Sequence, residues 1–273
     1  ILTEMKENNL AFDVALKQAQ ELGFAEADPT FDIEGVDAAH KITILASIAF
    51  GIPINFKATH IEGISNLEQK DIMYAEELGY KIKLLGITKC INDLVEQRVH
   101  PTLIPKSRLV ANVDGAMNAV LVHGDKVGPT LYYGAGAGSE PTASAVVADI
   151  IDLARNIESN NTNLIPILGF IKNEIKAKKI LSIEDITSEF YIRLSMKNES
   201  GVLAKITQVF AKHSISIDAM VQKEIQEDDE VVDIILVTSN MIEKEMNKII
   251  DEIEALPENN DKAIKLRIEQ LNS

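Results

Sequence analysis

Acidic residues crowd one stretch near the start of the chain, and a single lysine follows them. The acidic residues of this stretch, residues 26–37, are Glu26, Asp28, Asp32, Glu34 and Asp37, and the lysine is Lys41. Asp37 and Lys41 stand four positions apart, so on a helix their side chains share one face within ion-pair reach. Carboxylates that face one held ammonium suit a substrate carrying both an amino group and a reacting oxygen.

Two simpler interpretations compete with a catalytic one. The stretch could be a solvated loop capping a helix, with Asp37 and Lys41 as a surface ion pair worth about 0.3–0.5 kcal/mol. A calcium loop with Gly35 at its sixth position would place Thr30 at the first position and Lys41 at the twelfth, where a bidentate glutamate is required. The calcium interpretation therefore fails, and the capping loop stays open.

Helical patterns flank the acidic stretch. Residues 12–22 predict an amphipathic helix stopped by Gly23, and residues 36–50 predict a mostly apolar helix that ends at Gly51 and Pro53. Residues 65–68 have the pattern of a capping box that opens a helix closing at Gly79. The helix over residues 36–50 would therefore carry both Asp37 and Lys41.

Residues 81–133 change to a pattern of short alternating strands, with turns at residues 92–93, 114–115 and 124–125. This pattern predicts an α+β domain with a largely antiparallel or mixed sheet. A glycine run over residues 134–138 follows, and then a helix at about residues 141–157 with Pro141 in its first turn. The run does not fit a dinucleotide fingerprint, because the third glycine would fall at Ser139 and no strand with a ribose-binding acid follows.

A second compact unit is expected over residues 187–268, after a polar linker at residues 158–163 and a lysine-rich connector. Apolar alternation over residues 190–196 predicts a half-buried strand. The elements expected after it are a helix at 201–212, a strand at 215–223, an acidic turn at 226–229, a strand at 231–238, a helix at 242–256 and a strand at 263–268. This βαββαβ order is ferredoxin-like.

Composition narrows the classes of function. The chain has 273 residues and a net charge of −15, which argues against nucleic acid or anionic membrane surfaces as partners. The longest apolar run, residues 42–54, is too short to span a bilayer, and no signal peptide opens the chain. Cys90 is the only cysteine, and the histidines lack metal-ligand spacing. We therefore expect a cytoplasmic protein without disulfides or a metal, in which His40 and Cys90 pack rather than react.

The acidic stretch resembles the active-site motif of the homoserine dehydrogenase family. The matching positions are Ala19, Gly23, Asp28-Pro29, Asp32, Gly35, Asp37 and Lys41. By this resemblance Lys41 bonds the reacting oxygen and donates the proton, and Asp37 orients Lys41. Glu26 and Asp32 would bind polar groups of the substrate, with Glu26 on its ammonium. The resemblance also places Gly136 and Gly138 beside a nicotinamide cofactor.

The resemblance implies an enzyme that interconverts L-homoserine and L-aspartate 4-semialdehyde with NAD(P), on the path to threonine and methionine. Residues 1–158 would be the substrate domain, 159–186 a connector and 187–268 an ACT domain. The helix at 141–157 would pack back onto an amino-terminal Rossmann domain, which binds most of the cofactor and has no counterpart in these residues. The chain starts at Ile1 in helical sequence, as if cut from something longer, so we expect it to be inactive alone.

Residues 197–203 resemble the strand-to-helix turn of ACT domains, which sense amino acids. The residues expected at the regulatory ligand are Asn198, Gly201, Val202 and Leu203, and threonine is the ligand that the resemblance implies. Asn198 and Ser200 replace the commoner Asp and Pro of this turn. ACT pairing also implies a homo-oligomer.

The competing class of function is a non-catalytic protein that senses an amino acid. Another ACT-bearing dehydrogenase is disfavoured, because those families lack the Lys41 motif.

Overall fold

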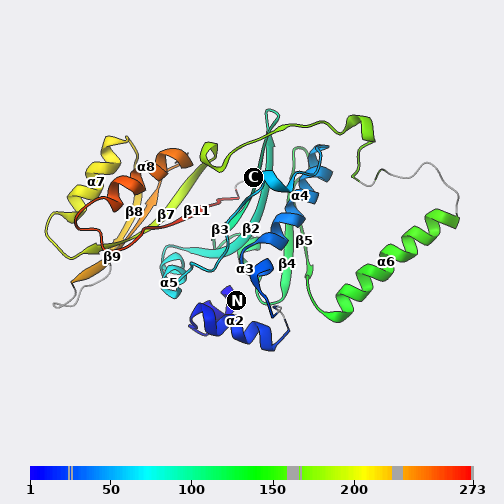
Figure 1. Ribbon diagram of the computed structural model, residues 1–273, viewed down its shortest axis with the longest axis horizontal. Coiled ribbons are helices and arrows are strands. Elements are labelled where there is room, and N and C mark those ends of the chain that lie inside the picture. Colours follow the sequence, from blue (N-terminus) through cyan, green and yellow to red (C-terminus); the bar gives the residue numbers. More distant parts are fainter. Residues whose placement is uncertain (24, 26, 159–165, 167, 223–229, 272–273) are drawn as a thin grey trace.

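The computed structural model describes residues 1–273 except 24, 26, 159–165, 167, 223–229 and 272–273. Figure 1 shows a central mixed sheet with helices against it, a smaller α/β unit at one end and a long helix projecting at the other. The first part of the chain consists of α1 (Leu2–Glu7), α2 (Phe12–Glu21), α3 (Thr30–Ile33), α4 (Val36–Phe50), β1 (His60–Ile61), α5 (Gln69–Glu77), β2 (Tyr80–Ile91), β3 (Leu94–Pro105), β4 (Met117–Gly124), β5 (Gly128–Ala135) and α6 (Ser139–Glu158).

The second part contains β6 (Lys179–Ile180), β7 (Thr187–Lys197), α7 (Val202–Lys212), β8 (Ile217–Gln222), β9 (Val231–Thr238), β10 (Met241–Ile242), α8 (Glu243–Glu254) and β11 (Ile264–Ile268). In the described part of the chain, these strands and β1–β3 form one mixed sheet of nine strands. The α+β class and the ferredoxin-like βαββαβ order predicted from the sequence are confirmed. The predicted acidic turn at 226–229 and most of the polar linker lie outside the described residues.

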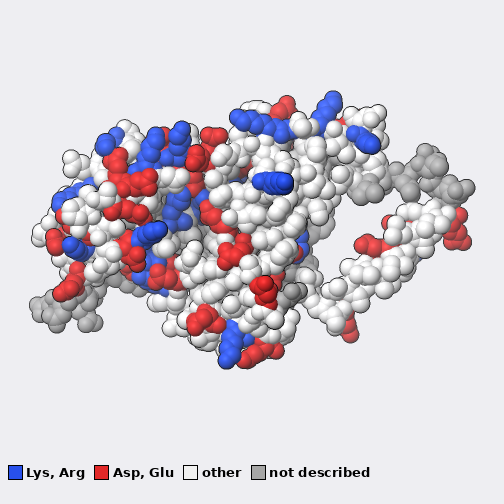
Figure 2. Space-filling view, viewed as in Figure 1, with Lys and Arg blue, Asp and Glu red and all other residues white. Residues whose placement is uncertain are grey.

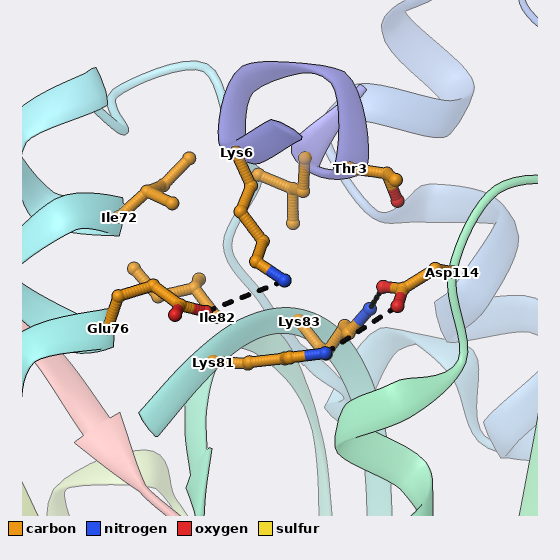
Figure 3. Close-up of a pocket in the computed structure, with 9 residues that line it drawn as sticks. Thr3, Lys6, Ile72, Glu76, Lys81, Ile82, Lys83 and Asp114 are labelled. Atoms are coloured by element: carbon orange, nitrogen blue, oxygen red, sulfur yellow. Dashed lines mark hydrogen bonds and ion pairs between the residues drawn. The ribbon is translucent and has the colours of Figure 1, made fainter. Parts of the chain in front are cut away.

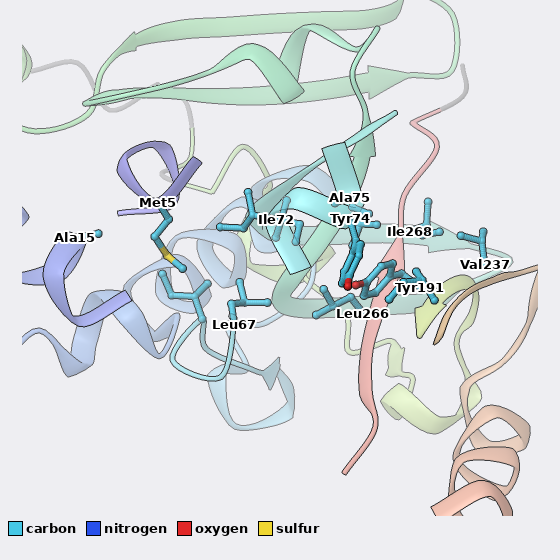
Figure 4. Packing of buried hydrophobic residues seen from close by; sticks show 14 residues of the cluster. Met5, Ala15, Leu67, Ile72, Tyr74, Ala75, Tyr191, Val237, Leu266 and Ile268 are labelled. Carbon is cyan, nitrogen blue, oxygen red and sulfur yellow. The ribbon is translucent and has the colours of Figure 1, made fainter. Parts of the chain in front are cut away.

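The closing strand β11 joins the two parts of the molecule. It runs parallel to β3, with Arg267 opposite Thr102, and antiparallel to β7, with Arg267 opposite Phe190. Buried apolar side chains from both parts form one cluster around this junction, among them Ile72, Tyr191 and Leu266 (Figure 4). The two units therefore share both a sheet and a core.

The prediction of short strands after residue 81 was wrong for the first pair. β2 and β3 are twelve residues each and pair along their whole length, with a turn at Asn92 and Asp93 where φ is 51° and 62°. Two consecutive positive φ values are typical of a type I′ hairpin turn. Most of β3 is buried, including polar side chains at Gln97, Arg98 and His100, so apolar alternation does not reveal its length.

The predicted capping box at residues 65–68 was also wrong. α5 begins at Gln69, and its capping box joins Glu68 to Asp71, whose carboxylate accepts the Glu68 N–H at 3.2 Å. The Ser65 hydroxyl instead donates to Glu34. Asp71 is held from outside the helix by Arg193 of β7, so a tertiary contact decides where this helix starts.

The predicted half-buried strand at 190–196 is buried on both faces. Phe190, Ile192 and Leu194 pack against α7 and α8, whereas Tyr191 joins the cluster near α5 and Arg193 binds Asp71. A strand covered on both sides needs no polar face, and here the second face carries Tyr191 and a paired arginine.

Apolar side chains are exposed on the β4–β5 hairpin and on α6. The hairpin exposes Val122, Tyr132 and Tyr133, and α6 has no buried residue. Figure 2 shows that α6 is mostly uncharged on the visible face. None of the described helices is long and apolar enough to cross a membrane.

Candidate active site and regulatory pocket

Helix α4 carries Asp37 and Lys41 on its solvent side. Its buried face is a row of apolar and small polar residues at helical spacing: Ala39, Ile42, Thr43, Ala46 and Ser47. Gly86 of β2 lets the helix lie close to the sheet, because a Cβ there would come within 3.1 Å of Ile42. The rotation of α4 is therefore fixed, and it turns the predicted pair outward.

Lys41 donates to Asp37 within α4, one turn apart, as predicted from their spacing. The Lys41 side chain is 67% exposed and that of Asp37 42%. At such exposure an ion pair stabilises the fold little. Asp37 lies in the first turn, where the helix dipole favours a carboxylate. The arrangement holds an ammonium in one place and leaves it accessible.

A buried polar network that the sequence did not indicate lies beneath α4. The Gln97 amide donates to Thr43 at 3.2 Å, to the Asn55 carbonyl at 3.1 Å and to Thr59. The Thr43 hydroxyl also donates to the Ala39 carbonyl at 2.7 Å. These bonds tie α4 to β3 close to Lys41. The available signal was the occurrence of Thr43 within the apolar pattern of residues 36–50, whereas Gln97 lies between Glu96 and Arg98.

The loop that precedes α4 carries Asp32 and Glu34 at the same end of the helix. Asp32 is exposed on α3, and Glu26 lies outside the described residues. Asp28 closes a turn by accepting from the Thr30 hydroxyl at 2.6 Å and the Thr30 N–H at 3.1 Å, and these bonds lower its pKa. Glu34 accepts from Ser65, so it holds two loops together.

His40 packs in a row of rings beside Lys41. Its imidazole stacks on Phe31 at 5.7 Å between ring centroids and on Phe56 at 4.1 Å, nearly parallel to both.

Cys90 is half-buried, with its sulfur 3.6 Å from Lys178 Nζ. Within the described parts of the chain, no three His, Cys, Asp or Glu side chains gather as metal ligands would.

The predicted cofactor glycines lie at the junction of β5 and α6, apart from α4 (Figure 1). Gly138 has a φ of 123°, and a Cβ there would meet Pro141 at 3.4 Å. Any side chain at Gly136 would overlap Asn118. A dinucleotide needs backbone that it can approach closely. Gly138 offers such backbone, whereas the space at Gly136 is already filled by Asn118.

The predicted regulatory residues gather in one pocket. Asn198, Gly201, Val202 and Leu203 line it from the β7–α7 turn, and Gln222 of β8 with Val232 and Ile234 of β9 complete it. Gly201 is the N-cap of α7, with a φ of 93°. The three strand residues were missed, because only the fold shows which strand positions face the turn.

A second small cavity contains a cluster of lysines near α1 (Figure 3). Lys83 and Lys81 lie 2.6 and 3.6 Å from Asp114, and Lys6 lies 3.6 Å from Glu76. Burial lowers the pKa of Lys81, against the opposing charge of Asp114. All three ammonium groups have a carboxylate partner, so this cluster joins α1, β2 and the segment before β4.

Comparisons with known proteins point to one family. Residues 1–151 match the family model described as homoserine dehydrogenase, and residues 190–258 match the ACT domain. Homoserine dehydrogenase of Neisseria gonorrhoeae is 54% identical over 256 residues, which cover 94% of this chain and 59% of that protein. That of Pseudomonas aeruginosa is 51% identical over 272 residues, covering 100% and 63%. The crystal structure of a homoserine dehydrogenase from Thiobacillus denitrificans superposes with a TM-score of 0.92 at 56% identity, covering 99% of this chain and 61% of that one.

The chain thus spans about three fifths of the length of these curated relatives.

Proposed function

Because the chain belongs to the homoserine dehydrogenase family and carries an ACT domain, we propose that it forms the substrate-binding and regulatory part of an NAD(P)-dependent enzyme. That enzyme would interconvert L-homoserine and L-aspartate 4-semialdehyde in threonine and methionine biosynthesis. The observation that carries the proposal is the accessible Lys41 ammonium, held by Asp37 at the end of an acidic loop. We propose the divisions 1–158, 159–186 and 187–268, which the matches over 1–151 and 190–258 support.

Lys41 would act on the oxygen of the reacting carbon. A bound nicotinamide would supply the acceptor or the donor of the hydride. In the direction of reduction, negative charge grows on the aldehyde oxygen, and the Lys41 ammonium stabilises it and donates a proton. Asp37 orients that ammonium. In the reverse direction the neutral Lys41 amine would take the hydroxyl proton of homoserine and become the ammonium again.

The acidic loop would bind the amino-acid end of the substrate. Asp32 is exposed at this end of α4, and Glu26 belongs to the same loop in sequence. A carboxylate pairs well with the substrate ammonium, so we assign that role to Glu26 and a polar contact to Asp32. Asp28 and Glu34 stay structural, since their carboxylates already accept from Thr30 and Ser65.

We propose that the cofactor is bound mainly by a nucleotide-binding domain that would precede these residues. The residues that would border it here are Gly136 and Gly138, and the open backbone at Gly138 supports this assignment better than the filled space at Gly136. We propose a cytoplasmic homo-oligomer, to which the exposed apolar face of the β4–β5 hairpin lends support, whereas the apolar side chains of α6 would pack against the nucleotide-binding domain.

Homoserine-dependent reduction of NAD(P)⁺ tests the proposed function. We expect no turnover by residues 1–273 and clear turnover once the nucleotide-binding segment of the relatives is joined upstream. The comparison uses both proteins at equal concentration, with homoserine omitted as the blank. Homoserine oxidation by residues 1–273 alone would contradict the proposal, and so would an inactive joined protein that is folded.

We propose threonine binding at the ACT pocket as a second activity, with or without catalysis. Gly201→Ala should weaken binding about tenfold, because a Cβ at a φ of 93° strains the turn that lines the pocket. Calorimetric titration of threonine into residues 1–273 measures this. Gly79→Ala is the matched control, since Gly79 has a φ of 87° and lies outside the pocket. Equal losses in both variants would argue against a ligand at this turn.

A further inference from the structure

Arg267 of β11 is a buried cation shared by the two parts of the molecule. Its side chain is 1% exposed. Nε and Nη2 donate to Glu243 at 2.7 and 2.6 Å, and Nη1 and Nη2 donate to Glu62 at 2.8 and 2.9 Å. Two such paired contacts on one guanidinium fix its plane and both carboxylates.

The two carboxylates belong to different parts of the chain. Glu243 is the first residue of α8 in the ACT unit, where its N–H donates to the Ile186 carbonyl at 2.9 Å. Glu62 directly follows β1 in the substrate-side unit, and its N–H donates to the Val99 carbonyl at 2.8 Å. Burial raises the pKa of Glu62, but bonds from His60 and Arg267 outweigh it and hold that pKa well below its usual range. Glu62 is therefore ionised, and the pair persists, at physiological pH.

The segment that starts at Glu62 supports the acidic loop. A Cβ on Gly63 would come within 2.6 Å of the Ile33 carbonyl oxygen, and the Ile64 N–H donates to that carbonyl at 2.8 Å. Ser65 donates to Glu34, and a Cβ on Gly35 would lie 3.5 Å from the Glu62 carbonyl oxygen. Residues 62–65 thus contact residues 33–35, which lie between Asp32 and Asp37.

We propose that Arg267 is a positioning residue for the acidic loop at residues 32–37 and acts on it through Glu62. Through the same contacts, Arg267 would transmit changes at the ACT pocket to that loop. This inference rests on the proposed function. β7 provides the connection, because Lys197 at one end lines the pocket and Phe190 near the other end pairs with Arg267. A shift of β7 or α8 moves the guanidinium, and with it Glu62 and the support of residues 33–35.

The alternative is that Arg267 only stabilises the fold. A second buried arginine in this chain serves as a matched control for that alternative. Arg193 of β7 is also buried, at 4% exposure, and also joins the two units through Asp71. Its hydrogen bonds run to Asp71 and Glu68, at the start of α5, rather than to residues 62–65. Arg193→Lys therefore perturbs a buried pair between the units without touching the support of the loop.

The kinetic experiment compares Glu62→Gln, Arg267→Lys and Arg193→Lys in the protein joined to its nucleotide-binding segment. We expect Glu62→Gln and Arg267→Lys to raise the KM for homoserine about tenfold with kcat within about twofold, and to weaken inhibition by threonine. Arg193→Lys should lower the melting temperature but leave KM within about twofold. Equal KM changes in all three variants would overturn the inference, whereas an inactive wild type would count against the proposed function.

A second measurement does not depend on activity. Hydrogen exchange of residues 1–273, followed by mass spectrometry, reports on the amides of residues 32–35, which donate within the loop to Pro29, Thr30 and Asp32. Glu62→Gln should speed their exchange about tenfold relative to Arg193→Lys. Unchanged exchange in folded Glu62→Gln and Arg267→Lys would overturn the positioning role whatever the enzyme catalyses.

Discussion

Lys41→Ala should lower kcat/KM for homoserine oxidation by about 10²–10⁴-fold in the protein joined to its nucleotide-binding segment. The reason is that the variant loses both the proton carrier and the positive charge facing the reacting oxygen. The fold should not suffer, because the Lys41 side chain is 67% exposed and its pair with Asp37 is a surface pair. Steady-state kinetics and a melting curve, measured on the same preparation, separate the two effects.

Two further variants sharpen this test. Lys41→Arg keeps a cation beside Asp37 but cannot release a proton, so we expect it to recover substrate binding and not kcat. Lys57→Ala, in the turn after α4, removes an exposed lysine from the neighbourhood and should leave the rates unchanged. A loss smaller than about threefold in Lys41→Ala would reduce the Asp37–Lys41 pair to a surface ion pair.

The sequence predicted the first and the last residue of α4 correctly, because a glycine stands next to each end of the helix. Gly35 and Gly51 adopt φ values of 77° and 61° at its two caps, a conformation in which glycine is strongly preferred. Its four-residue spacing also predicted the pair of Asp37 with Lys41, since that contact lies within one helix. Interactions between residues close together in the sequence were therefore sufficient to predict α4 and its pair.

The contacts that place the loop could not be predicted in this way. Arg267 and Glu62 are 205 residues apart, and their encounter depends on β11 pairing with β3. Neither the closing strand nor β3 shows in its own sequence which strand it will pair with. The missed capping box has the same cause, because Asp71 is fixed by Arg193 across 122 residues. Sequence patterns thus reveal the catalytic candidates, and the fold reveals what holds them.

The largest effect on stability is expected at the buried pair of Asp71 and Arg193. Asp71 is fully buried and accepts from Arg193 Nε at 2.7 Å and from the Tyr191 hydroxyl at 3.0 Å. Asp71→Ala should lower the free energy of unfolding by about 3–5 kcal/mol, because it leaves a buried guanidinium without its main partner. Urea denaturation of residues 1–273 measures the change. Lys70→Ala is the control, since Lys70 is 39% exposed and should cost no more than about 1 kcal/mol.

A double variant separates the cost of an orphaned charge from the net worth of the pair. Asp71→Leu with Arg193→Met removes both charges, and apolar replacements of a buried pair are often neutral or stabilising. Recovery should be partial here, because the buried Tyr191 hydroxyl loses its acceptor, which costs about 1–3 kcal/mol. If Asp71→Ala alone costs less than about 1 kcal/mol, water reaches Arg193 and the pair does not hold the two units together.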